Sequence, residues 1–342
     1  MKGKSMKAVG FKKSLKIEEN ESLIEIEKEI PKAEGFDIVV KVNAISVNPA
    51  DTKIRIRTAP DKILDTPKIM GYDAVGIIEE IGEKVTNFNI GDRVFYAGDV
   101  TRDGSNAEFQ SVDSRIVALA PVSLSDAQAA VLPLTSLTGY EALFDRLRIN
   151  PHEKKTILII GGAGGVGSIT TQIAKQLTNL TVIATASREE TIQWCKDMGA
   201  DHVVNHKDLV NSVNEAGFDT VDYIFNVADT KGHWDSMVEL IAPQGMISSV
   251  VEFEGGIDLS KLQAKAAGFI WELMFTRSLF NTKDMHRQGE ILSDIANLVD
   301  CGRIKTTLTQ TLNGFSVEIL KEAHKRVESS TSIGKLAIDY SK

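Results

Sequence analysis

The stretch TILIIGGAGGVGS, residues 156–168, places five glycines directly behind a short β-branched and apolar run. Because glycine loses more backbone freedom on folding than any other residue, a cluster of glycines at the end of a strand needs a reason. One interpretation is a loose turn. The other is a loop that binds a phosphate, since the spacing Gly162-x-Gly164-x-x-Gly167 fits the dinucleotide-binding fingerprint. The sequence on either side of the glycines decides between the loose turn and the phosphate-binding loop.

Strand and helix patterns alternate on both sides of this loop. The apolar run at 156–160 is followed by apolar residues at helical spacing, and a second buried-strand pattern covers 180–186. A helix is predicted over 187–199, where Ser187 and Glu190 form a capping box and Gly199 is a C-terminal cap. Further strands are predicted at 202–205, 221–227, 246–251 and 269–275. From about residue 129 onward the pattern therefore predicts a doubly wound parallel sheet.

The glycine loop now has the context that a dinucleotide site requires. Between a strand and a helix, the first glycine permits a tight turn, the second lets the backbone approach a pyrophosphate, and the third lets helix and strand pack closely. No lysine follows the last glycine, which excludes a nucleoside-triphosphate loop. A methyltransferase loop is the remaining alternative, and the β-rich segment in front counts against it. The predicted cofactor-binding residues of the loop are Gly162, Gly164, Gly165, Val166 and Gly167.

The end of the second predicted strand indicates which dinucleotide binds. An NAD site carries Asp or Glu about 20 residues after the loop, on the ribose 2′-hydroxyl. Here Ala186 stands at that place, and Ser187 and Arg188 follow. A hydroxyl and a guanidinium can bind a 2′-phosphate, so we expect NADPH. The alternative is that Ser187 only caps the helix and Arg188 is solvated; the neighbouring Glu189 and Glu190 also weaken the attraction for a phosphate.

Composition and charge exclude several classes of protein. The 342 residues have a formal net charge of −8, which argues against a binder of nucleic acid or of an anionic membrane. No apolar run is long enough to span a membrane, and no apolar signal core is present near the N-terminus. Two cysteines, Cys195 and Cys301, fit the reducing cytoplasm. We expect residues 1–5 to be an extension ahead of a natural start at Met6, where MKAVGF is typical of a first strand.

Several stretches together resemble the medium-chain dehydrogenase/reductase superfamily over nearly the whole chain. They are GYDAVGIIEEIGEKVTNFNIGDRV (71–94), LPLTSLTGYEAL (132–143), GGAGGVGS (161–168) and MGADHVVNH (198–206). The resemblance is in particular to the quinone oxidoreductase branch, including proteins described as zinc-type alcohol dehydrogenase-like. It implies a GroES-like β-barrel catalytic domain over 1–128 and 278–342, and a Rossmann NADPH-binding domain over 129–277. It also implies an active site between the two domains and a homodimer paired through an exposed edge of the Rossmann sheet.

The sequence departs from the zinc members of this superfamily where they hold their catalytic metal. The matching segments SVNPAD, GYDAVG and LPLTSLTG offer Asn48, Tyr72 and Leu134, with Asp73 nearby. Zinc sites use Cys thiolate, His imidazole and carboxylate, so we expect no metal site. The pair His202 and His206 falls on a predicted strand and its end. We expect His206 to lie beside the adenosine part of the cofactor and not to bind a metal.

Without a metal, a conjugated acceptor suits the chemistry better than an alcohol, because conjugation delocalises the charge that hydride addition creates. We expect Asn48 and Tyr72 to donate hydrogen bonds to the acceptor, the alternatives being a turn residue before Pro49 and a packed ring. Asp51 and Asp73 are expected to brace the loop or barrel. The resemblance places Thr138 beside the nicotinamide; its alternative role is a hydroxyl at a helix start. The ends of the predicted strands add the cofactor-binding residues Asn226, Val227, Ser249, Val250 and Val251.

The sequence therefore predicts an NADPH-dependent reductase of a quinone or conjugated enone that works without catalytic zinc. Two alternatives within enzymes are a zinc-type alcohol dehydrogenase and a reductase of reactive alkenals. A third, from another class, is a non-catalytic NADPH-binding protein of the crystallin type. The sequence alone does not name the physiological electron acceptor, the number of electrons passed to a quinone in each step, or a proton donor.

Overall fold

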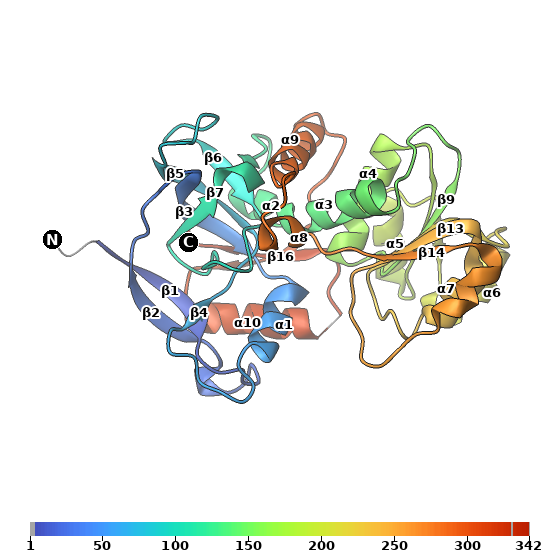
Figure 1. Ribbon diagram of the computed structural model, residues 1–342, viewed down its shortest axis with the longest axis horizontal. Helices are drawn as coiled ribbons and strands as arrows, with labels where there is room; N and C mark the ends of the chain where they lie inside the picture. Colours follow the sequence, from blue (N-terminus) through green and yellow to red (C-terminus); the bar gives the residue numbers. More distant parts are fainter. Residues whose placement is uncertain (1–3, 330, 342) are drawn as a thin grey trace. The chain divides into compact units, whose positions relative to one another are not determined.

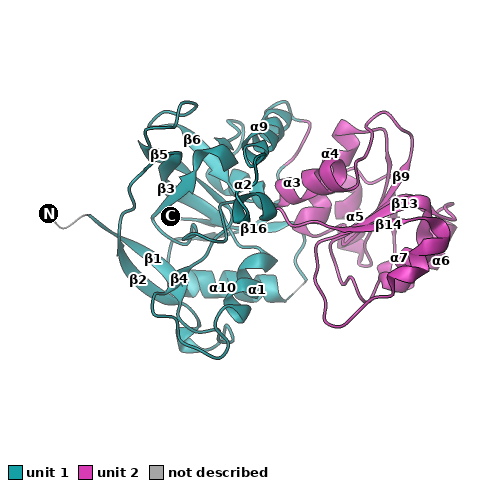
Figure 2. Ribbon diagram, viewed as in Figure 1, with its two compact units in different colours: residues 1–134, 275–302, 306–342 teal, residues 135–274, 303–305 magenta. Residues whose placement is uncertain are grey.

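The computed structural model describes residues 4–329 and 331–341, which form two compact units (Figures 1 and 2). Unit 1 comprises residues 1–134, 275–302 and 306–342, and unit 2 comprises residues 135–274 and 303–305. Of the expected N-terminal extension, residues 1–3 lie outside the described residues, and Ser5 already belongs to the first strand. No helix among the described residues is long and apolar enough to cross a membrane.

Unit 2 is built on a six-stranded sheet in which every neighbouring pair is parallel. Its strands are β9 (Thr156–Ile160), β10 (Thr181–Thr185), β11 (His202–Val204), β12 (Val221–Asn226), β13 (Ile241–Ser249) and β14 (Gly268–Trp271). The spatial order is β11-β10-β9-β12-β13-β14, which is the order 3-2-1-4-5-6 of a dinucleotide-binding sheet. The predicted doubly wound parallel sheet is confirmed.

Helices follow the strands of this sheet in alternation. They are α3 (Pro133–Tyr140), which begins two residues before unit 2, α4 (Gly165–Leu177), α5 (Glu189–Asp197), α6 (Leu209–Glu215) and α7 (Trp234–Leu240). Shorter helical turns cover Glu141–Arg146, His206–Asp208 and Leu259–Lys265. The central strand β9 is buried from Ile157 to Ile160, because a parallel strand has a layer on each face and so reads as a continuous apolar run.

Unit 1 is mainly antiparallel and contains two sheets. The first has the strands β1 (Ser5–Phe11), β2 (Ile24–Glu29) and β4 (Lys68–Ile69). The second has β3 (Asp37–Ser46), β5 (Ala74–Ile81), β6 (Arg93–Tyr96), β7 (Phe109–Asp113), β8 (Val117–Leu119), β15 (Leu308–Asn313) and β16 (Lys335–Asp339). Its helices are α1 (Pro49–Arg57), α2 (Asp126–Ala130), α8 (Thr276–Leu279), α9 (Arg287–Asp300) and α10 (Val317–Glu328), with short helical turns at Asn20–Ser22 and Ser114–Ile116.

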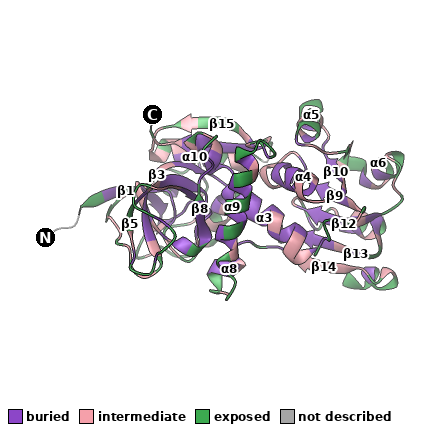
Figure 3. Cartoon of the chain, turned by 90° about the horizontal axis from the view of Figure 1, so that it is seen from above, coloured by how far each residue is buried: buried purple, intermediate pink, exposed green. Residues whose placement is uncertain are grey.

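The last strand of the chain completes the second sheet of unit 1. β16 pairs antiparallel with β3, and Ala337 lies opposite Ser46. The middle of this sheet is buried, as the purple strands of Figure 3 show, and the apolar core includes Ile38, Val40 and Ile338. The pairing carries the C-terminal segment to the end of β3, where the chain enters α1 at Asn48.

The start of α5 differs from the prediction. The expected capping box of Ser187 and Glu190 is wrong, because the cap residue is Arg188 and α5 begins at Glu189. Thr191 closes the cap instead: its hydroxyl accepts from the Arg188 N–H at 3.1 Å and donates to the Arg188 carbonyl at 2.7 Å. Thr191, at the third helical position, binds the N–H of the cap residue Arg188, which is the role that the prediction gave to Glu190 at Ser187. The predicted cap at Gly199 is confirmed by its φ of +101°.

Candidate active site

The glycine loop joins β9 to α4 at the carboxyl edge of the unit 2 sheet. Gly161 takes a φ of +91°, and its N–H donates to the Thr185 hydroxyl at 2.9 Å. A Cβ at Gly162 would stand 2.8 Å from the Cβ of Ala184, and one at Gly167 only 2.2 Å from the Gly161 carbonyl oxygen. These two glycines are therefore required for the packing of strand against helix.

Gly164 is different, because a Cβ there would meet only the Gly161 carbonyl oxygen, at 3.7 Å. Its φ of −75° and ψ of 173° suit any residue. Neither packing nor backbone conformation explains this glycine, whereas the close approach of a ligand does. Gly164 is also the cap residue of α4 and supplies no side-chain cap, so the N–H groups of the first turn, which includes Gly165, Val166 and Gly167, suit a phosphate. The loop fits a dinucleotide.

Other predicted cofactor residues follow the neighbouring strands at the same edge. Ser187 is half-buried after β10, and Arg188 is exposed, with its guanidinium 3.3 Å from the Glu190 carboxylate. His206 follows β11, and its ring centre lies 6.4 Å from that of His233. Partial burial lowers the pKa of both imidazoles, assisted at His206 by Lys207 and at His233 by the His206 charge. Both are therefore neutral at pH 7.

The ends of β12 and β13 form a buried hydrogen-bond network. The Asn226 amide donates to the hydroxyls of Ser249 and Thr230, at 3.0 Å each, and the Thr230 hydroxyl donates to the Val251 carbonyl at 2.6 Å. The Val227 N–H donates to the Ile160 carbonyl, and the Val250 N–H to the Asn226 carbonyl. These contacts fix the sheet edge beside the glycine loop. Thr138 is buried on α3.

Unit 1 holds a buried polar cluster around Asn48 and Asp73. The Asn48 side-chain amide donates to Asp73 Oδ2 at 2.8 Å, and its carbonyl oxygen accepts from Lys335 Nζ. Lys335 Nζ also donates to Asp73 Oδ2 at 3.2 Å, and the Leu134 N–H donates to Asp73 Oδ1 at 2.7 Å. Asn48, Asp73 and Lys335 are 1%, 0% and 6% exposed, so this is an ion pair inside the domain.

Tyr72 and Asp51 are two further buried polar groups close in sequence to this cluster. The Tyr72 hydroxyl is fully buried and has no hydrogen-bond partner among the described residues; the Phe275 ring stands edge-on to the Tyr72 ring at 5.1 Å between centres. Asp51 Oδ2 accepts from the Asn48 N–H at 2.8 Å, and the Gly71 backbone also contributes a hydrogen bond that lowers the pKa of this carboxyl group. An unpartnered buried polar atom is unfavourable, and so the Tyr72 hydroxyl requires an explanation.

Burial dominates the acid–base properties of this cluster. It raises the pKa of Asp73, although Lys335, the Asn48 amide and the Leu134 N–H oppose the shift. Burial raises the pKa of Asp51 to about 7, against the hydrogen bond from Asn48 and the charge of Lys335. It also raises the pKa of Tyr72, with a further contribution from the Asp51 charge. Tyr72 therefore stays a neutral donor at pH 7.

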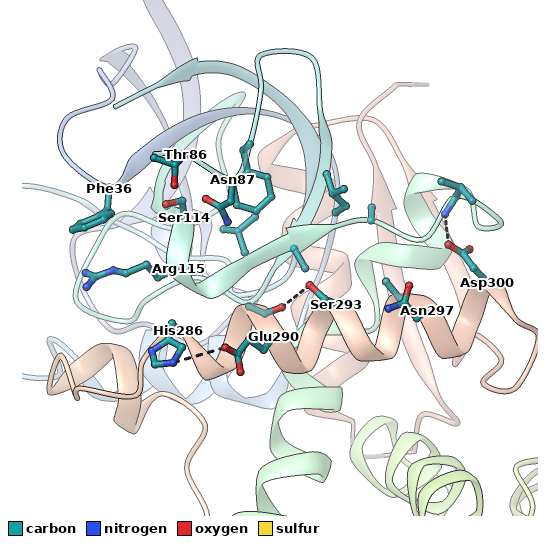
Figure 4. Close-up of a pocket in the computed structure, with 18 of the residues that line it drawn as sticks. Phe36, Thr86, Asn87, Ser114, Arg115, His286, Glu290, Ser293, Asn297 and Asp300 are labelled. Carbon is teal, nitrogen blue, oxygen red and sulfur yellow. Dashed lines mark hydrogen bonds and ion pairs between the residues drawn. The ribbon is translucent and has the colours of Figure 1, made fainter. Parts of the chain in front are cut away.

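A groove of about 650 Å³ in unit 1 is separate from these residues (Figure 4). It runs along α9, where Ser293, Asn297 and Asp300 face the strand β8, and none of the predicted site residues lines it. The Asp300 carboxylate in this groove already has protein partners, because it accepts hydrogen bonds from the N–H groups of Val122 and Ser123. The groove does not replace the site predicted from sequence.

Three residues that organise the site were not predicted from the sequence: Lys335, Thr230 and Thr185. Lys335 begins the terminal strand KLAID ahead of three apolar residues, and a charged side chain at that place is a signal for a buried partner. Thr185 directly precedes Ala186, the position at which an NAD site carries its acid, and its hydroxyl accepts the Gly161 N–H of the glycine loop. Thr230 lies in a connecting loop, where no spacing rule applies.

Comparison with known proteins identifies both parts of the chain. Models of the alcohol dehydrogenase GroES-like domain and of zinc-binding dehydrogenase match residues 34–121 and 165–286. A zinc-type alcohol dehydrogenase-like protein of Staphylococcus aureus is 48% identical over 98% of this chain and 100% of its own length. A crystal structure from Rhizobium etli, solved as a candidate zinc-dependent alcohol dehydrogenase, is 47% identical, covers 98% of both chains and gives a TM-score of 0.94.

More distant relatives are named as reductases. The 2-methylene-furan-3-one reductase of Solanum lycopersicum is 28% identical over 99% of this chain and 79% of its own. The chloroplastic NADPH-dependent alkenal/one oxidoreductase of Arabidopsis thaliana is 26% identical over 90% of this chain and 73% of its own. Two matched domains, a dinucleotide-binding sheet and a full-length relative at 48% identity place the chain in the medium-chain dehydrogenase/reductase superfamily of oxidoreductases.

Proposed function

We propose that the protein reduces a quinone or a conjugated enone with NADPH and without catalytic zinc. The observation that carries this proposal is the Tyr72 hydroxyl, a neutral buried donor without a partner among the described residues. A carbonyl oxygen that gains negative charge during reduction would supply the missing acceptor. The two relatives described above, one named for a methylene furanone and one for alkenals and alkenones, support the choice of a conjugated acceptor.

The cofactor would bind at the carboxyl edge of the unit 2 sheet. Gly164 leaves room for the pyrophosphate, and the first turn of α4 offers its N–H groups. Because Ser187 does not cap α5, its hydroxyl is free of that role, and together with Arg188 it would bind the 2′-phosphate. When bound, NADPH supplies a hydride to the acceptor. The name of the Arabidopsis relative supports NADPH over NADH.

The residues at the metal positions of zinc relatives do not suit Zn²⁺. Zinc sites need at least three thiolate, imidazole or carboxylate ligands, and no such group of three converges in residues 4–329 and 331–341. The Asn48 amide is already bonded to Asp73 and Lys335, and the Lys335 ammonium would repel a divalent cation. No step of the proposed reaction therefore passes through a metal.

The hydrogen bonds refine the roles of the two predicted donors. The Asn48 amide donates to Asp73 and, at 3.4 Å, to the Ser46 carbonyl, so its hydrogens already have acceptors. We therefore assign the acceptor contact to Tyr72, and to Asn48 the task of holding Asp73 and Lys335 in place. Because Tyr72 is fully buried, the Phe275 ring beside it has to move when the acceptor binds.

The test is NADPH oxidation against quinones, enones, alkenals and saturated alcohols, for the parent and for Tyr72→Phe. The variant keeps the ring but loses the donor, so we expect turnover to fall by about 10²-fold with an unchanged NADPH dissociation constant. Relative rates in the panel separate enone from alkenal reduction. If no acceptor is turned over while NADPH still binds, the non-catalytic alternative replaces the proposal.

We further propose that two copies pair through β14, in the cytoplasm. This strand forms the edge of the unit 2 sheet, and Trp271 and Leu273 beside it are 45% and 50% exposed. Apolar side chains on an open strand edge favour pairing with a second strand. Light scattering of the parent should give a molar mass twice that of one chain. In Leu273→Asp the measured mass should fall toward that of a single chain. A parent protein with the mass of a single chain would contradict the pairing.

A further inference from the structure

His206 lies beside the residues to which we assign the 2′-phosphate. β10 and β11 are parallel neighbours, in which Thr185 lies opposite Val204 and the Ala186 N–H donates to the Val204 carbonyl at 3.0 Å. Ser187 and His206 each stand two residues beyond this last pair. Neighbouring strands lie about 4.8 Å apart, so residues at equivalent positions leave the sheet side by side. The register therefore places His206 next to Ser187 at the carboxyl edge of the sheet.

A second imidazole contacts His206 at this edge. His233 directly precedes α7, and its ring stands edge-on to that of His206, with 6.4 Å between the ring centres. β10 and β9 separate β11 from β12 in the sheet, so the two rings meet beside the carboxyl ends of those strands, near the glycine loop. Both side chains are half-buried, and neither imidazole has a hydrogen-bond partner in residues 4–329 and 331–341. Their ring nitrogens are therefore available to a ligand.

The charged groups around the two imidazoles are mixed in sign. Lys207 acts electrostatically on His206, and Asp229 acts on His233. The other charged residues on the neighbouring elements are Arg188, Glu189 and Glu190 at the start of α5, Asp208 at the start of α6, and Lys231 and Asp235 around the start of α7. Among these residues the acids outnumber the bases, so the fixed charges alone do not favour a phosphate.

Two of these basic side chains already contact protein oxygens. The Arg188 guanidinium lies 3.3 Å from the Glu190 carboxylate, and the Lys231 ammonium donates to the Glu254 carbonyl at 3.1 Å. A phosphate monoester carries nearly two negative charges at pH 7. Its binding here therefore calls for a further cation, and His206 is a residue at the right place in the register that can become one.

The protonation state of His206 depends on what is bound beside it. Burial, assisted by the charge of Lys207, lowers its pKa, so the ring is neutral at pH 7 without cofactor. A phosphate in contact with the ring favours the imidazolium form, which donates a charge-assisted hydrogen bond to a phosphate oxygen. His233 limits the pair to one proton, because burial and the charge of His206 lower its pKa.

We propose that His206 binds the 2′-phosphate of NADPH together with Ser187 and Arg188, and that it takes up one proton from water when the phosphate binds. This rests on the proposed function, which makes NADPH the cofactor. His233 is not given this role, because it follows β12, which β9 separates from β10. NADH has no 2′-phosphate and causes no such proton uptake. The preference for NADPH over NADH therefore increases as the pH falls through neutrality.

Calorimetry of NADP⁺ and NAD⁺ binding, in two buffers of different ionisation enthalpy, counts the protons taken up. With NADP⁺ at pH 7, the parent should take up close to one proton more per site than His206→Gln, whose amide donates but does not titrate. With NAD⁺ the two proteins should not differ. This comparison cancels the protons released by the 2′-phosphate itself, whose pKa is about 6. Between pH 6.5 and 8.5 the parent should lose about 10-fold of its preference for NADP⁺, and His206→Gln much less.

The matched control is His233→Gln, which should keep the proton uptake and the pH dependence of the parent. In proton NMR, the His206 resonance, assigned by its absence from His206→Gln, should titrate at higher pH with NADP⁺ bound than with NAD⁺ bound. An unchanged midpoint, parent-like proton uptake in His206→Gln, or loss of the uptake in His233→Gln alone would overturn this proposal and leave NADPH as the cofactor. Equal dissociation constants for NADP⁺ and NAD⁺ at every pH would overturn the cofactor of the proposed function, and this inference with it.

Discussion

At the scale of single residues, three glycines of one loop have different physical roles. Gly162 and Gly167 lie against the strand and the loop backbone, where a side chain cannot fit. Gly164 faces open space that a ligand can fill. The spacing of the glycines predicted the loop correctly because the fingerprint is local. The contacts distinguish the two glycines that packing requires from Gly164, which packing does not require and to which we assign the cofactor.

Gly164→Val should abolish NADPH binding and leave the melting temperature nearly unchanged, since its Cβ meets only one atom, at 3.7 Å. The matched control is Gly167→Ala, whose Cβ would lie 2.2 Å from the Gly161 carbonyl oxygen. That variant should lose stability by about 1–3 kcal/mol or more, the effect of overpacking. Fluorescence titration with NADPH and thermal melting measure the two effects. An unchanged NADPH dissociation constant in Gly164→Val would show that this glycine serves only the turn.

Arg188→Ala should weaken NADPH binding and leave NADH binding nearly unchanged. A charge-assisted hydrogen bond contributes about 1.5–3 kcal/mol, or roughly 10- to 100-fold in affinity. The exposed ion pair with Glu190 has to open for this contact. Glu190→Gln is therefore a useful control and should strengthen NADPH binding slightly. Equal dissociation constants of the parent for the two cofactors would contradict the assignment, as would an equal loss for both in Arg188→Ala.

At the scale of elements, the pairing of β16 with β3 assembles the polar cluster. The register places Ala337 opposite Ser46, so that Lys335, two residues earlier, reaches Asn48 just beyond the end of β3. No pattern within the terminal segment identifies β3 as the partner of β16. Nothing local links two residues 287 positions apart, whereas the helices and strands of unit 2 follow from patterns within a few residues. The long-range part of the site was therefore not predictable from the sequence.

Lys335→Met should destabilise the protein, because it leaves Asp73 as a buried charge without its ion-pair partner. The loss of one partner of a buried pair costs about 3–5 kcal/mol. Burial already holds the Asp73 pKa above its unfolded value, and removal of Lys335 raises it further. The folded variant then binds the proton more tightly than the unfolded chain does, so its deficit should be small near pH 5 and grow toward pH 9.

Urea unfolding at pH 5, 7 and 9 measures this deficit. The double variant Lys335→Met with Asp73→Asn removes both charges and should recover most of the stability at pH 9. Asp51, whose pKa Lys335 also lowers, changes in the same direction and does not reverse the trend. A deficit that is independent of pH would show that Lys335 contributes packing and not charge.

At the scale of the whole molecule, the chain combines the two domains of its superfamily with a buried cluster of Asn48, Asp73 and Lys335. The matched domains and the relative at 48% identity establish the family. The proposed reaction depends on a few side chains within that frame. Asn48, Tyr72, Asp73 and Lys335 lie together in unit 1, and Lys335 provides a cation within this group. In the proposed reaction, hydrogen bonds without a metal stabilise the negative charge that develops on the acceptor.

One measurement tests this account most directly: zinc analysis of protein purified without chelator, followed by NADPH oxidation with a quinone, an enone and a saturated alcohol, each with and without excess chelator. We expect less than stoichiometric zinc, turnover of the conjugated acceptors that the chelator leaves unchanged, and negligible alcohol oxidation with NADP⁺. Stoichiometric zinc, together with activity that is lost on chelation and restored by added Zn²⁺, would contradict the account and make alcohol oxidation the leading function.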